Sequence, residues 1–236
     1  MNHDNSERDA EREKTEELLT ELIKRGATME QIALLKDPTA NSPEEALRAL
    51  KMGNARFLSG ASQKNSVSVN ERRAQIMTQT PFAVVLGCSD SRVPTEIVFD
   101  VGPGDIFSIR VAGNVVSPGT LGSVEYAIDH LKVHLLVILG HEGCGAVEAA
   151  MQPPAERAQE PEYVRFVLDQ IVQSVDNLPE IRDSKARMRE AIVRNVWHQK
   201  TLLESNPVVS AGIASGKLRV VGGYYSISSG AVDFLE

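Results

Sequence analysis

The chain has 236 residues, 42% of them hydrophobic, and a formal net charge of −7, which suits one domain with a sizeable core and an extension. An acidic chain without a basic patch argues against a nucleic-acid surface, and the lack of any run of about 18 apolar residues argues against a membrane span. Two cysteines and a polar N-terminus unlike a secretory signal fit a reducing compartment, so we expect a cytoplasmic protein.

Residues 1–40 predict a charged helical extension. Gly26 follows two basic residues and is typical of a helix C-cap. Thr28 and Gln31 have the spacing of a capping box, which predicts a second short helix reaching Leu35. A stripe of apolar residues at helical spacing favours either a solvated helix or an arm that docks on another subunit. The stripe consists of Leu18, Leu19, Leu22 and Ile23.

The next helix has a strong start signal. Ser42 suits the cap position, Pro43 the first helical position and Glu45 the third, so a helix is expected from here to about Leu58. A loop rich in Ser, Gln and Asn follows. Residues 71–77 predict one or two further helical turns, which stop before Pro81.

From Phe82 onward, short apolar runs alternate with helical patterns. Strands are predicted at 82–87, 106–111, 134–139 and 217–226, with a returning edge strand at 231–235. Helices are predicted at 95–100, 119–131, 144–151, 162–176 and 184–204, with a loop at 152–161. This order predicts an α/β fold: a mostly parallel central sheet flanked by helices, with an N-terminal helical arm and an antiparallel edge strand near the C-terminus. The domain itself is expected to span residues 41–236.

The only two cysteines each follow an apolar run that predicts a buried parallel strand. Cys88 follows the run that begins at Phe82, and His141 and Cys144 follow the run that ends at Leu139. Because ligands bind at the carboxyl ends of parallel strands, we expect these three side chains to meet there. Two thiolates and an imidazole suit a catalytic zinc ion with an open fourth position. A disulfide or two ordinary buried thiols are the alternatives.

Asp90 and Arg92 follow the first cysteine at two and four residues. An arginine fork can pair with a carboxylate and keep it ionised, so that Asp90 can orient a zinc-bound hydroxide toward a carbon electrophile. The alternative is a surface ion pair of little energetic value.

The motif Cys-Ser-Asp-Ser-Arg at 88–92, followed by His-x-x-Cys-Gly at 141–145, resembles the β-class carbonic anhydrases. The resemblance covers about residues 42–236 and includes segments at 104–107, 110–114 and 123–127. It implies zinc-dependent, reversible hydration of carbon dioxide to bicarbonate and a proton by zinc-hydroxide attack. It also implies the paired role of Asp90 and Arg92.

The resemblance further implies a substrate pocket made by Gln79, Phe107 and Tyr126, as in the plant-like branch of the family. There the glutamine contacts a substrate oxygen and the aromatic pair comes from the neighbouring subunit. A homodimer is therefore the smallest expected unit, with a tetramer or a larger assembly also allowed. Considered without the family, Phe107 and Tyr126 favour core positions and Gln79 a loop.

Two other functions remain open at this stage: hydrolysis of carbonyl sulfide or carbon disulfide on the same scaffold, and a non-catalytic zinc protein. The chain departs from the family pattern at Glu142, where many relatives carry a small polar residue, and at Val111, where Asn is common. Val85 stands where relatives that close the site in acid carry a tryptophan, so Asp90 is expected to stay paired with Arg92.

Overall fold

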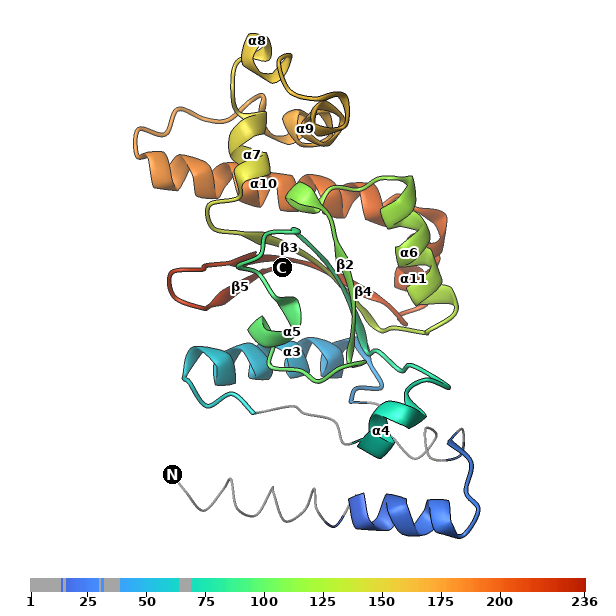
Figure 1. Cartoon of the computed structure of the whole chain (residues 1–236). Helices are drawn as coiled ribbons and strands as arrows, with labels where there is room; N and C mark the ends of the chain where they lie inside the picture. Colours follow the sequence, from blue (N-terminus) through green and yellow to red (C-terminus); the bar gives the residue numbers. More distant parts are fainter. Residues whose placement is uncertain (1–13, 15, 30, 32–38, 64–68) are drawn as a thin grey trace.

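The computed structural model describes residues 14, 16–29, 31, 39–63 and 69–236. These residues include one five-stranded sheet in the order β2-β1-β3-β4-β5 (Figure 1). Its strands are β1 (Ala83–Gly87), β2 (Ile106–Arg110), β3 (Leu135–His141), β4 (Arg219–Tyr225) and β5 (Val232–Leu235). The first four run parallel and β5 is antiparallel to β4, which confirms the predicted fold class.

Helices cover both faces of the sheet (Figure 1). One face carries α3 (Pro43–Leu58) and α5 (Thr95–Val98), and the other carries α6 (Pro118–Asp129), α10 (Ser184–Glu204) and α11 (Pro207–Ala214). Two more helices, α7 (Gly145–Ala150) and α9 (Glu162–Val175), pack on α10, and α8 (Pro154–Arg157) joins them. The remaining short elements are α4 (Val69–Ala74) and a 3-10 turn, η1 (Ala112–Asn114).

The start of α3 follows from local chemistry. The Glu45 amide donates to Ser42 Oγ at 3.2 Å, while Glu45 Oε2 accepts from the Asn41 amide at 2.8 Å. Each bond satisfies a backbone donor near the start of the helix, where no carbonyl partner exists within the helix. The helix ends at Leu58 as predicted, and its face with Leu47 and Leu50 is buried.

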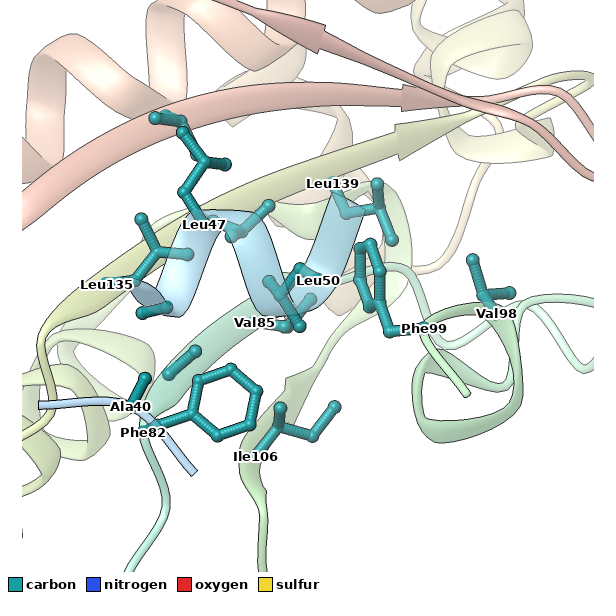
Figure 2. Close-up of a cluster of buried hydrophobic side chains, with 14 of the residues drawn as sticks. Ala40, Leu47, Leu50, Phe82, Val85, Val98, Phe99, Ile106, Leu135 and Leu139 are labelled. Carbon is teal, nitrogen blue, oxygen red and sulfur yellow. The ribbon is translucent and has the colours of Figure 1, made fainter. Parts of the chain in front are cut away.

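The strands alternate between two cores. Ala83 and Val85 of β1 pack toward α3, in the cluster with Leu50 that Figure 2 shows. Val84 and Leu86 point the opposite way, into the cluster under α6 and α10. Because both faces are covered, every residue of β1 and β3 is buried, which explains their continuous apolar runs.

Glycines at two strand positions leave room for side chains of α10 to pack directly on the sheet. A Cβ added at Gly140 would lie 2.7 Å from both Ile192 Cγ2 and Val196 Cγ2. At Gly222 it would lie 2.8 Å from Val196 Cγ1. Carbon atoms pack at about 3.5–4.0 Å, so no larger residue fits without moving the helix. The glycines therefore fix the position of α10 against β3 and β4.

Three short elements differ from the prediction. No element was predicted over α11, although Asn206 caps it, accepting from the Val208 amide at 2.9 Å, and Pro207 occupies its first position. The predicted loop at 152–161 contains the single turn α8, which also begins at a proline. The turns predicted at 71–77 lie earlier, as α4. Helices this short leave almost no hydrophobic period to detect.

The described part of the N-terminal extension is helical up to residue 24, and Gly26 has a φ of 94°, as its C-cap role requires. Leu19 of the apolar stripe is buried and packs in one cluster with Ala74 of α4, within the same chain. Thr28 and Gln31 exchange the predicted capping bonds, at 2.9 and 3.2 Å. The rest of that predicted helix lies outside the described residues.

Within the described residues, every helix is either too short or too polar to cross a membrane.

Candidate active site

The carboxyl ends of β1 and β3 bring the two cysteine segments together. Cys88 directly follows β1, His141 is the last residue of β3, and Cys144 occupies the cap position of α7. The register aligns Gly87 with Leu139, so the two strands end side by side. As a result one donor atom from each of the three side chains lies within 4.8 Å of the others, and all three residues are buried.

The donor set fits a metal ion. His141 Nδ1 lies 3.0 Å from the carbonyl oxygen of Glu142, which can only accept, so Nδ1 carries the proton. Nε2 then presents its lone pair, and it is buried with no hydrogen-bond partner among the described residues. Both cysteines are free thiols. The three donor atoms, two sulfurs and one unpartnered imidazole nitrogen, lie close together. This set matches the ligand preference of zinc.

The two thiols influence each other strongly. The Cys144 thiol is the main cause of the lowered pKa of Cys88, and His141 and the Gly113 amide, 3.4 Å from Cys88 Sγ, lower it further. The neighbouring Cys88 and burial raise the pKa of Cys144. The pair thus gives up one proton readily and holds the second until a cation compensates the charge.

Asp90 and Arg92 form a forked ion pair beside the donor set. Arg92 donates from Nη2 to Asp90 Oδ2 at 2.7 Å, and from Nε to Oδ1 at 3.0 Å. Its backbone amide also reaches Oδ1, at 2.9 Å. These bonds from Arg92 hold the pKa of the Asp90 carboxyl well below its usual range. Asp90 Oδ2 also lies 3.9 Å from His141 Nε2, so the carboxylate borders the space that the donors face.

Arg110, at the end of β2, braces this loop and was not singled out from the sequence. It donates from Nε to the Cys88 carbonyl at 3.1 Å and from Nη2 to the Asp90 carbonyl at 2.6 Å. Its position at the carboxyl end of a predicted strand is the signal that could have identified it.

Glu142 faces away from the donors. Its carboxylate accepts from the Ser228 amide at 2.8 Å and from Ser226 Oγ at 3.2 Å, in the turn between β4 and β5. The Ser228 amide is the main cause of its lowered pKa. Glu142, which departs from the family pattern, therefore anchors the β4–β5 turn directly after His141 in the chain.

The three predicted pocket residues lie away from the donors of their own chain. The Phe107 and Tyr126 rings contact each other, with centroids 6.3 Å apart, and Tyr126 is 46% exposed. Phe107 pairs with Val84, four residues before Cys88 and so about 13 Å back along the strand. Gln79 is exposed and precedes β1, at the opposite end of the strand from Cys88. Phe107 and Gln79 are thus placed away from the donors of the same chain, and Tyr126 lies against Phe107.

A mostly parallel α/β sheet whose strand ends carry a Cys-His-Cys donor set beside an Asp–Arg pair has the make-up of a metalloenzyme site. The family profile described as carbonic anhydrase matches residues 83–232. Carbonic anhydrase 2 of Mycobacterium tuberculosis is 42% identical over 194 residues, covering 82% of this chain and 92% of that protein. The Mycolicibacterium smegmatis carbonic anhydrase is 38% identical over 197 residues, covering 83% and 94%.

Solved structures agree. A tetrameric β-carbonic anhydrase of Sordaria macrospora superposes with a TM-score of 0.65 at 29% identity, covering 80% of this chain and 95% of that one. The chain belongs to the β-class carbonic anhydrases, enzymes that hydrate carbon dioxide.

Proposed function

We propose that Cys88, His141 and Cys144 hold one zinc ion and that the chain uses it to interconvert carbon dioxide with bicarbonate and a proton. The observation that carries this proposal is the buried donor set, with its unpartnered His141 Nε2. Zinc held by two thiolates and an imidazole would lower the pKa of a water molecule in its fourth position, so that hydroxide is available to attack carbon dioxide near or above neutral pH.

Asp90 orients the attacking hydroxide. Arg92 and its amide occupy Oδ1 twice, whereas Oδ2 accepts only one bond, from Arg92 Nη2. A carboxylate oxygen has two acceptor sites, so Oδ2 keeps one for the O–H of a hydroxide near His141. An ionised Asp90 accepts this bond and does not donate, which would turn a lone pair of the hydroxide toward the carbon atom. Arg92 keeps the carboxylate both charged and correctly rotated.

A second subunit completes the site. The placement of Gln79, Phe107 and Tyr126 near the amino ends of the strands supports this, because it separates them from the donors of their own chain. The aromatic pair, partly buried at Phe107 and half-exposed at Tyr126, presents an apolar surface suited to uncharged carbon dioxide. We propose a homodimer as the smallest active unit, and the tetrameric relative from Sordaria macrospora is in line with such assembly.

Metal analysis combined with a carbon dioxide hydration assay tests the proposal. The wild-type chain should bind one zinc ion and hydrate carbon dioxide. Cys144→Ser replaces a soft anionic ligand by a poor one, so metal and activity should be lost together. A Cys144→Ser protein that keeps its zinc and full activity would refute the ligand assignment.

A further inference from the structure

We propose that Asn195 and Gln199, two buried amides of α10, are positioning residues for the metal centre. They hold the η1 turn so that the Gly113 amide stays directed at Cys88 Sγ. The inference rests on the proposed metal site and extends it to a helix that contributes no ligand. Both side chains have no exposed surface.

Asn195 fixes one side of Gly113. Its Nδ2 donates to the Gly113 carbonyl at 2.9 Å, and the Gly113 amide in turn lies 3.4 Å from Cys88 Sγ. Gly113 has a φ of 67°, in the left-handed region. Because glycine has no side chain, its backbone could adopt many other conformations. A carbonyl held in place removes those alternatives, so the amide keeps its direction toward the sulfur. A thiolate that accepts such a bond has a defined orientation before any ion binds.

Gln199 fixes the orientation of Asn195. Its Nε2 donates to Asn195 Oδ1 at 3.0 Å and to the Gln170 carbonyl at 3.2 Å, while its Oε1 accepts from the Val116 amide at 2.7 Å. Because Asn195 Oδ1 must accept, its Nδ2 must be the atom that faces Gly113. The Val116 bond secures the chain just after the η1 turn.

The helix that carries both amides is itself immobilised. Val196, next to Asn195, fills the spaces left by Gly140 and Gly222, and Ile192 packs beside it. A helix that only covered the sheet would use apolar residues here, because burying an amide is costly unless its hydrogen bonds are made. The bonds that Asn195 and Gln199 make lead to the segment 113–116 that borders Cys88.

Asn54 offers a matched control on the other face of the sheet. It is also a buried asparagine that bridges backbone groups, donating to the carbonyls of Val98 and Gly230 and accepting from the Val232 amide at 2.8 Å. None of these partners is a metal donor or belongs to η1. Asn195→Leu and Asn54→Leu should therefore both lower the thermal midpoint, but only Asn195→Leu should affect the metal.

The readouts are the zinc dissociation constant, from competition with a chelator on the folded apoprotein, and the thiolate-to-metal absorption of the cobalt-substituted protein. Asn195→Leu should weaken zinc binding by about 10–100-fold and shift the cobalt spectrum, as is usual when residues that orient ligands are removed. Asn54→Leu should leave both unchanged. Gln199→Met should also weaken zinc binding and shift the cobalt spectrum. If Asn195→Leu does not fold, Gln199→Met is the variant that tests the positioning role.

Wild-type affinity and spectrum in a folded Asn195→Leu or Gln199→Met protein would overturn the positioning role, and so would an equal loss in Asn54→Leu. A wild-type chain that binds no metal would overturn the metal assignment itself, so the two failures are distinguishable.

Discussion

Two inactive variants should restore activity when they share a dimer. Cys144→Ser removes a metal donor but leaves Phe107 and Tyr126 intact. Phe107→Ala combined with Tyr126→Ala removes the aromatic pair but leaves the donors intact. If the pair serves the partner's site, a mixed dimer contains one site with wild-type donors from one chain and wild-type aromatics from the other.

The size of the effect follows from the geometry. Phe107 lies level with Val84, about 13 Å along the strand from Cys88, so it cannot contribute to the site of its own chain. Random reassortment makes half of the dimers mixed, and each mixed dimer has one intact site out of two, so about a quarter of wild-type activity should return. The unmixed variants should each remain nearly inactive.

The assay is carbon dioxide hydration after the two variants are unfolded together and refolded with zinc. A mixture of Cys88→Ser and Cys144→Ser is the control, because all three donors converge within one chain and no mixed dimer then has a complete set. Recovery in the control, or no recovery in the test mixture when mixed dimers are present, would refute the two-chain site.

Three further predictions concern single residues. Arg92→Ala should keep its zinc but lower kcat/KM by about 10–100-fold, because Asp90 loses its orientation; unchanged kinetics would contradict the role of the pair. Burial lowers the pKa of His198, whose Nε2 has no partner among the described residues, so the unfolded chain takes up this proton more readily and stability falls as the pH drops below about 6.5. His198→Gln should flatten that slope in urea denaturation at pH 5 to 6.5, and an identical slope would argue against it. Gly140→Ala should cost about 1–3 kcal/mol of unfolding free energy by overpacking, whereas Gly122→Ala, where a Cβ meets nothing within 4 Å, should cost nothing.

The sheet was predictable because its strands are buried on both faces. The apolar runs before Cys88 and before His141 are continuous, and the residues after them must lie at one edge of a parallel sheet. Short helices were missed where length left no periodicity, as at α11. Local sequence could place the three candidate donors together, since each lies at or just after the end of a recognisable strand.

The supporting contacts were not predictable, since they join residues far apart in the chain. Asn195 and Gln199 are ordinary polar residues in a helical pattern, and only the tertiary packing directs them at Gly113 and Val116. Glu142 directly follows His141 in the sequence, but Ser228, 86 residues later, holds its carboxylate at the β4–β5 turn. Such directions are set by register and helix placement, which a single sequence does not contain.

The pairing of β3 with β4 determines when, during synthesis of the chain, the surroundings of the two cysteines are completed. The segment after His141 that leads to Cys144 is secured when the Glu142 amide donates to the Tyr225 carbonyl at 2.8 Å, and Tyr225 comes later in the chain than both cysteines. A ribosome extends the chain from its N-terminus, so both thiols emerge before the strand that completes their surroundings. Contacts so distant in sequence form late, so the proposed metal site, which depends on them, would bind an ion tightly only after they have formed. Until β4 docks, the nascent chain carries two unprotected thiols that are open to oxidation or to the wrong ion.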